Sequence, residues 1–408
     1  MDSLKNMIKE KQYVPEQWQV IKLSEACEKI TDGVHSTPKY VKYGVPFLSV
    51  NNLLNERLSF DSCKYITKEA HQHLTKRCSP KKGDVLMGKV ATIGVSAVVN
   101  SNTEFSIFVQ IALLRPKMIL NSYYLKYFLE LPSFRNYVHS LASGTTIKYI
   151  GINQIEKLKI LLPPLKEQEK IVEILSSCDR AIELTEKLIA SKRKLKRGLM
   201  QIIFRSYNEY IMLGDLVEIK GRIGWRGYTR HDLRTSGHLV IGGTQITKFN
   251  QLDFSNPTYL STEKYEESPE IQIKFKDIIL VKTGNTIGKV ALVDRNIGTA
   301  TINPNTVILR AKKIDEKYLY YLMTSNYFQS KLWSFVVVGA QPSVNQENIK
   351  KIKIPVVSYQ EQKNIATNLS LLAQEIDLLN SLKATIQKQK KGLMQQLLTG
   401  KTRVPLNQ

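Results

Sequence analysis

The sequence predicts an α+β fold: two α/β domains in a tandem pseudo-repeat, separated by two long helices that pair as an antiparallel coiled coil. The run GLMQ occurs at residues 198–201 and again at 392–395, an offset of 194. The Glu-Gln pair at 167–168 recurs at the same offset, at 361–362. A constant shift over so long a stretch indicates one unit duplicated head to tail.

Four segments follow from the repeat. Residues 1–161 and 207–354 are expected to be the α/β domains, a size that suits an ordinary globular domain. Residues 162–206 and 355–408 are expected to be long helices, the second with a C-terminal tail.

Within each α/β domain, β-branched runs punctuated by glycine predict strands and hairpins. The expected strands are 45–50, 84–87 and 94–99 in the first domain, and 238–241, 277–281 and 288–293 in the second. Aromatic residues at helical spacing in 122–129 and 316–322 predict one helix per domain that packs on the sheet.

The long helices should begin after Pro163-Pro164 and after Pro355. A 3-4 spacing of mostly apolar residues predicts a coiled coil of helices about 55 Å long. The short connection near Tyr207 favours antiparallel pairing. The first stripe comprises Ile171, Ile174, Cys178, Ala181, Thr185, Leu188, Lys192, Leu195, Leu199 and Ile202. The second comprises Ile365, Asn368, Leu372, Ile376, Leu379, Leu382, Ile386, Gln389 and Leu393.

The net charge of +23 favours a polyanionic partner, either nucleic acid or an anionic membrane face. Both halves share the excess, with 31 basic against 19 acidic residues up to position 204 and 28 against 17 beyond it. No apolar run approaches the roughly 20 residues of a membrane span, so no membrane association is expected. Four cysteines without CxxC spacing argue against zinc or a disulfide framework and favour a cytoplasmic location.

Motifs of catalysis are missing from the sequence. The glycine run at 284–290 has three residues between its glycines and Val290 after the lysine, so it fails as a phosphate loop. Its counterpart at 88–94 fails as well, and both are expected to be hairpin turns. With no dinucleotide fingerprint, HExxH pair or nucleophile elbow, we expect a non-enzyme that holds neither cofactor nor metal.

Basic and aromatic loops remain as candidate contacts with double-stranded DNA, because Arg reads guanine edges and phosphates and amides read adenine edges. The candidates in the first domain are His35, Lys39, Tyr40, Lys89, Lys148 and Tyr149. Those in the second are Arg222, Trp225, Arg226, Tyr228, Arg230, Lys282, Asn285 and Gln341. Divergent loops on a repeated scaffold favour two modules that read different sequences.

These motifs resemble the specificity subunit of type I restriction-modification systems. The resemblance rests on the domain entry at 14–18, the proline–Glu-Gln helix starts at 162–168 and 355–362, and the helix ends at 196–201 and 392–404. It implies two target-recognition domains with conserved spacer helices and a bipartite DNA target.

The resemblance also implies partners: two modification subunits that use S-adenosylmethionine to methylate adenine N6, and restriction subunits that use ATP with Mg²⁺. The setting would be the prokaryotic cytoplasm. Residues expected to dock the partners are Glu167, Gln168, Ile171, Leu199, Met200, Glu361, Gln362, Leu393 and Met394. The alternative is a non-catalytic scaffold that binds modification subunits without reading DNA sequence; its weak DNA binding would not depend on salt.

Overall fold

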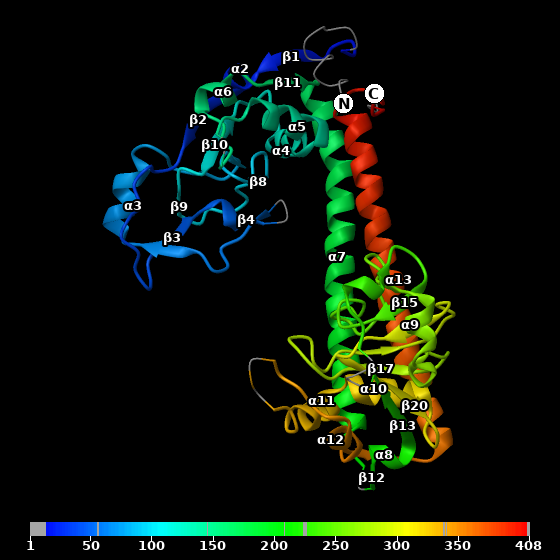
Figure 1. Cartoon of the computed structure of the whole chain (residues 1–408). Helices are drawn as coiled ribbons and strands as arrows, with labels where there is room; N and C mark the ends of the chain where they lie inside the picture. Colours follow the sequence, from blue (N-terminus) through cyan, green and yellow to red (C-terminus); the bar gives the residue numbers. More distant parts are fainter. Residues whose placement is uncertain are drawn as a thin grey trace. The chain divides into compact units, whose positions relative to one another are not determined.

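The computed structural model describes residues 14–54, 57–144, 146–207, 209–222, 227–337, 339 and 341–405. The chain divides into two compact units. Unit 1 contains residues 1–185 and 382–408, and unit 2 contains residues 186–381. The long helices α7 (Leu165–Ile203) and α13 (Tyr359–Leu397) each contribute to both units (Figure 1).

Unit 1 is built on a four-stranded antiparallel sheet of order β2-β10-β7-β8, with β3 between β6 and β9 in a second sheet and β1 paired with β11. Its strands are β1 (Gln19–Lys22), β2 (Cys27–Asp32), β3 (Val45–Leu48), β4 (Leu53–Leu54), β5 (Arg57–Leu58), β6 (Lys64–Ile66), β7 (Val85–Gly88), β8 (Ser96–Val98), β9 (Ser106–Ile107), β10 (Ile111–Pro116) and β11 (Lys159–Leu162). Its shorter helices are α2 (Leu23–Ala26), η1 (Val50–Asn52), α3 (Lys68–Thr75), α4 (Ser122–Glu130), α5 (Pro132–Leu141) and α6 (Ile152–Glu156).

Unit 2 repeats this plan with the sheet β13-β20-β17-β18, a second sheet β14-β16-β15-β19 and the pair β12-β21. Its strands are β12 (Tyr210–Met212), β13 (Val217–Gly221), β14 (Leu233–Arg234), β15 (His238–Ile241), β16 (Tyr259–Leu260), β17 (Ile278–Val281), β18 (Val290–Leu292), β19 (Ala300–Ile302), β20 (Thr306–Ala311) and β21 (Lys353–Pro355). Its shorter helices are α8 (Leu213–Leu216), η3 (Arg230–Asp232), α9 (Thr262–Glu266), η4 (Pro269–Ile271), α10 (Glu316–Thr324), α11 (Asn326–Trp333) and α12 (Gln346–Lys350).

The predicted strands and aromatic helices are confirmed. All six predicted strand segments contain a strand, and α4 and α10 pack on β8 and β18. The glycine runs form the expected hairpins, β7–β8 and β17–β18. Positive φ angles occur at Gly94, Gly284 and Gly288, where an L side chain would be strained. Among the described residues, no helix has both the length and the apolar character needed to cross a bilayer.

An ion pair with a buried carboxylate is repeated in the two sheets. In unit 1, Nε and Nη2 of Arg115 each donate to the Asp84 carboxylate over 2.8 Å. In unit 2, the same two nitrogens of Arg310 donate to Asp277, also over 2.8 Å. Both carboxylates are buried. Such bidentate pairing compensates the cost of burying the charge and fixes the strand that carries each arginine.

The repeated Glu-Gln motif is explained by an amide clamp. Oε1 of Gln168 accepts from the backbone nitrogen of Asn121, the N-cap of α4, at 2.8 Å, while its Nε2 donates to the Pro163 carbonyl at 2.8 Å. Gln362 makes the same contacts with Asp315, the N-cap of α10, at 2.8 Å and with Val357 at 2.9 Å. Each glutamine therefore ties the start of a long helix to the start of the aromatic helix.

The long helices run antiparallel within each unit, as predicted. In unit 1, Asp179 of α7 pairs with Lys390 of α13 at 2.6 Å, while Glu167, earlier in α7, meets Arg403, beyond α13, at 2.7 Å. In unit 2, Lys192 pairs with Glu375 at 2.8 Å, and the Tyr207 hydroxyl donates to Glu361 at 2.9 Å. Figure 1 shows the two helices side by side in each unit.

The predicted contact stripe is wrong over part of each helix. Leu188, Leu195 and Ile202 are exposed, while Ile189 and Met200 are buried. On α13 the exposed stripe positions are Asn368, Leu382 and Gln389, and their neighbours Leu369 and Lys390 are buried instead. A strict seven-residue repeat drifts by about 20° per heptad on a straight 3.6-residue helix, so the buried line moves to the following residue.

Candidate nucleic-acid interface

Two loops meet beside the sheet of unit 1. Val90, after β7, forms an isolated bridge with Tyr149, which also bridges Ser143 in the loop between α5 and α6. The backbone nitrogen of Ala91 donates to the Lys148 carbonyl at 3.0 Å. Three predicted DNA contacts, Lys89, Lys148 and Tyr149, thus come together, with the last two exposed.

Asp32, the last residue of β2, connects this loop cluster to a second set of basic groups. Its buried carboxylate lies 3.0 Å from Nζ of Lys89, 2.6 Å from Nη2 of Arg77 and 3.3 Å from Nε2 of His35. Burial by itself would raise the pKa of Asp32, but hydrogen bonds from Arg77 and Lys89 outweigh it and hold this pKa below its ordinary value.

Arg77 was missed by the sequence-based prediction. It lies 45 residues from Asp32 in the chain, with no aromatic or glycine-rich context to single it out. Only the fold brings its half-exposed guanidinium beside the predicted residue His35 and onto the Asp32 carboxylate that Lys89 also contacts.

Unit 2 builds the same pair of loops. Ser343 bridges both Thr283 and Val337, and the backbone nitrogen of Gly284 donates to the Pro342 carbonyl at 2.8 Å. This brings the predicted residues Lys282, Asn285 and Gln341 together, with the latter two exposed. The scaffold is therefore shared, whereas its side chains differ: Pro342 and Ser343 occupy the positions of Lys148 and Tyr149, 194 residues earlier.

Lys89 and Lys282 occupy equivalent positions, one residue beyond β7 and β17, yet their environments differ. Lys89 is buried and paired with Asp32. Lys282 is half-buried, and its ammonium has neither hydrogen bond nor ion pair with any residue that the structure describes. Burial lowers the pKa of Lys282. A polyanion can therefore engage Lys282 as an unpaired cation, while the charge of Lys89 is already matched.

The remaining predicted residues are dispersed. Tyr40 is half-buried against Phe47, with its ring centroid 5.9 Å away, and Lys39 beside it is exposed. Arg230 is exposed on η3, and Tyr228 is half-buried. Trp225 and Arg226 lie outside the described residues.

Arg222, predicted to contact DNA, has a buried guanidinium. It donates from Nε to the Ile302 carbonyl at 3.3 Å and from Nη2 to the Thr301 hydroxyl at 3.1 Å. It also lies 5.4 Å from the ring of Tyr228. Desolvation lowers the pKa of Arg222. The visible role of Arg222 is to anchor its loop.

Most residues predicted to dock partners are buried within the chain. Glu167 accepts from Trp18 at 2.9 Å and from Arg403, so it joins the two ends of unit 1. The buried set is Glu167, Gln168, Ile171, Met200, Gln362 and Met394. Leu199 and Leu393 are partly buried, and Glu361 is exposed beside Tyr207. The repeat of these residues reflects internal contacts.

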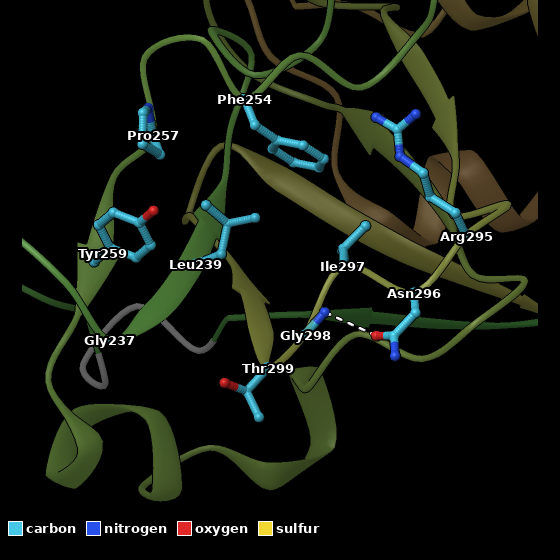
Figure 2. Close-up of a pocket in the computed structure, with 10 residues that line it drawn as sticks. All are labelled: Gly237, Leu239, Phe254, Pro257, Tyr259, Arg295, Asn296, Ile297, Gly298 and Thr299. Carbon is cyan, nitrogen blue, oxygen red and sulfur yellow. Dashed lines mark hydrogen bonds between the residues drawn. The ribbon is translucent and has the colours of Figure 1, made fainter.

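A hollow of about 470 Å³ opens in unit 2, where Figure 2 shows Phe254, Leu239 and Ile297 gathered near Arg295. In unit 1, Phe60, the equivalent of Phe254 in the repeat, packs against Phe105 with ring centroids 5.6 Å apart. The residue of unit 2 equivalent to Phe105 in the strand pairing is Ala300. None of the predicted DNA contacts lines this hollow.

Comparison with known protein families matches residues 15–191 and 208–388 to the type I restriction modification DNA specificity domain. The type I restriction enzyme MjaVIII specificity subunit of Methanocaldococcus jannaschii is 25% identical, over 96% of this chain and 94% of the relative. The putative MjaX specificity subunit of the same organism is 26% identical, over 96% and 95%.

Two solved structures share the fold. The S subunit of a type I restriction-modification system from M. genitalium matches with a TM-score of 0.58 at 15% identity, over 97% of this chain and 98% of that one. A chain from a study of assembly and conformational transition of the type I R-M system matches with a TM-score of 0.61 at 15% identity, over 96% and 100%.

Proposed function

Because the chain belongs to the type I restriction-modification DNA specificity family, we propose that it reads a two-part DNA target, one part with each unit. The observation that carries this proposal is the duplicated loop cluster. In both units the loop after β7 or β17 contacts the loop before the short helix α6 or α12. The side chains of these loops differ between the units. A shared scaffold with divergent contact residues suits two different half-sites.

The charge distribution supports a nucleic acid as the ligand. The basic excess is divided almost evenly between the halves of the chain, so each half can attract its own DNA segment. Exposed Lys148 in unit 1 and unpaired Lys282 in unit 2 supply cations within the loop clusters themselves.

The chemistry in this proposal belongs to partner subunits. Adenine N6 is out of reach inside a stacked duplex, so the base must be flipped into the pocket of a methylating subunit. Two modification subunits with S-adenosylmethionine would methylate it, and restriction subunits with ATP and Mg²⁺ would cut unmodified DNA in the cytoplasm. This chain would contribute sequence recognition and no catalytic group.

The long helices offer a docking surface for those subunits. Leu184 and Leu378 are equivalent in the repeat, as are Leu188 and Leu382, and all four side chains are exposed. Exposed leucines that recur at equivalent places favour two copies of one partner, each contacting a copy of the same apolar surface. These exposed leucines add to the docking residues predicted from the sequence, most of which are buried within the chain.

Mapping of methylated adenine across the genome, with and without this chain, tests the proposal. We expect one two-part motif to lose methylation when the chain is absent. If every adenine motif persists, the chain does not direct methylation. DNA binding that does not weaken with added salt would instead favour the scaffold alternative.

A further inference from the structure

The glycine of the repeated GLMQ run has no explanation within the chain. Gly198 lies in the interior of α7 and Gly392 in that of α13, although glycine is a poor helix former. Both glycines are exposed, and neither has a positive φ angle. A Cβ at either position would meet no atom within 4 Å beyond its own stretch of helix. Neither conformation nor internal packing therefore requires glycine, which points to close approach by another molecule.

The helix around each glycine carries positive charge alone. Residues 189–203 and 383–397 contain five and four cations and no acid. Cations near a helix C-terminus can complement the helix dipole, but that effect falls off within the last turn. Lys194 and Lys388 each lie nine residues before the end of their helix. The dipole therefore does not account for them.

Some of these cations are engaged inside their own unit. In unit 2, Nζ of Lys196 lies 4.7 Å from the ring centroid of Tyr321. In unit 1, Nζ of the equivalent Lys390 lies 5.2 Å from the ring centroid of Tyr127 and 2.6 Å from the Asp179 carboxylate. Because equivalent lysines contact equivalent tyrosines, the two helices turn the same face toward the core of their unit. Their outward faces are equivalent as well.

Two cations and the glycine share the outward face of each helix, because residues i, i+3 and i+4 lie side by side on a helix. We call each such group a basic glycine patch. The patches comprise Lys194, Arg197 and Gly198 in unit 2, and Lys388, Lys391 and Gly392 in unit 1. All four cations are exposed, and they have neither hydrogen bond nor ion pair with any residue that the structure describes.

Two unpaired cations beside open backbone match the phosphate chain of a nucleic acid. Each strand repeats a negative charge at every phosphate, so neighbouring phosphates can meet neighbouring cations. Since glycine has no Cβ, a strand can approach the helix closely enough for both cations to reach it. An apolar protein surface matches the patch less well, because contact would take two charges out of water without pairing them.

We propose that each basic glycine patch contacts the phosphate backbone of the target DNA without reading its bases. The inference rests on the proposed DNA-recognition function and gives the long helices a part in it. The loop clusters select the sequence, while the patches add affinity that does not depend on sequence. Because the patch recurs in the repeat, each unit contributes one set of phosphate contacts.

The experiment uses the full chain assembled with its modification subunits, and measures affinity for target and unrelated duplexes over a range of salt concentrations. Lys194→Gln combined with Arg197→Gln should lower the slope of log affinity against log salt by about 2. Affinity for both duplexes should fall by a similar factor, about tenfold. Lys166→Gln is the matched control, because Lys166 is an exposed, unpaired lysine of α7 outside the patch, and it should leave the slope unchanged.

Replacement of the glycine separates close approach from charge. Alanine and leucine both form helix more readily than glycine, so the melting temperature of Gly198→Ala and Gly198→Leu should hold or rise. DNA affinity should nevertheless fall severalfold for alanine and further for leucine, with the preferred bases unchanged. A loss of affinity in a chain of equal or greater stability does not come from unfolding.

Three results would overturn the inference. An unchanged salt slope in the double variant would remove the patch from the DNA interface. A change in the preferred bases would make the patch part of the base-reading surface. Loss of a modification subunit from Gly198→Leu, seen by native mass spectrometry, would make it a protein interface. If the unmodified assembly shows no sequence preference, the proposed function fails, whereas a lowered slope in the double variant would still support the patch.

Discussion

Units 1 and 2 have the same scaffold but different interface chemistry. The hydrogen-bond lengths in the ion pairs Asp84–Arg115 and Asp277–Arg310 agree to 0.1 Å. Those of the glutamine clamps at the starts of α7 and α13 agree equally well. Beside the sheets, by contrast, Lys89 is paired and Lys282 is not. The side chains that are the same in both units therefore lie where the sheet meets the helices, whereas the side chains of the loops differ.

The largest expected effect tests the shared scaffold. Asp84→Asn and Asp277→Asn each leave a half-buried arginine without its buried carboxylate, which should destabilise the corresponding unit by about 3 kcal/mol. Urea unfolding followed by circular dichroism measures both. The two losses should agree within about 1 kcal/mol; a large loss in one unit and none in the other would show that the scaffolds are not equivalent.

Substitutions on the proposed docking surface should weaken the binding of modification subunits almost as strongly. Leu378→Asp and Leu184→Asp change equivalent exposed leucines, and each should weaken the binding of one modification subunit by about 2 kcal/mol or more. Native mass spectrometry counts the bound subunits. Met118→Asp is the control, since Met118 is the most exposed of these apolar side chains and lies outside the long helices. Full assembly of both leucine variants would rule out this surface.

The amide clamps should contribute less. Gln168→Ala removes three hydrogen bonds and Gln362→Ala removes two. Each leaves the backbone nitrogen of an N-cap residue unsatisfied, at a cost of about 1–2 kcal/mol. Thermal unfolding measures the change. Losses near zero in both variants would mean that the repeated Glu-Gln motif has another role, such as partner contact.

The smallest effect should distinguish the loops. Lys282→Met should lower the slope of log affinity against log salt by about 1, whereas Lys89→Met should leave it unchanged. Because burial lowers the pKa of Lys282, its charge is lost at a lower pH than that of an ordinary lysine. DNA affinity should therefore fall as pH rises through that lowered pKa, and Lys282→Met should remove this fall. Equal slopes for the two variants would contradict the difference between units.

Much of the fold follows from local patterns. The offset of 194 residues, the proline helix starts and the β-branched runs predict the duplication, the long helices and the strands, because each depends on neighbours in the chain. Local patterns do not predict which residues of the long helices face each other, because this depends on whether the helix pair is supercoiled or straight.

The candidate site is less accessible to prediction. A basic loop appears free in a sequence, yet Arg222 gives its donors to Thr301 and Ile302, about 80 residues away. Arg77 is the opposite case. No local sequence pattern predicts that it belongs to the candidate interface, and only its contact with Asp32 in the fold places it there. Repeated residues such as Gln168 and Gln362 suggest a shared partner, whereas their repeat reflects the same internal contact.

Exchange of one recognition region tests the central claim most directly. Residues 207–354 would be replaced by those of a relative with a different target, and methylated adenine would be mapped across the genome. If each unit reads its own half, one half of the motif should change while the other stays constant. A change in both halves, or in neither, would contradict the assignment of one half-site to each unit.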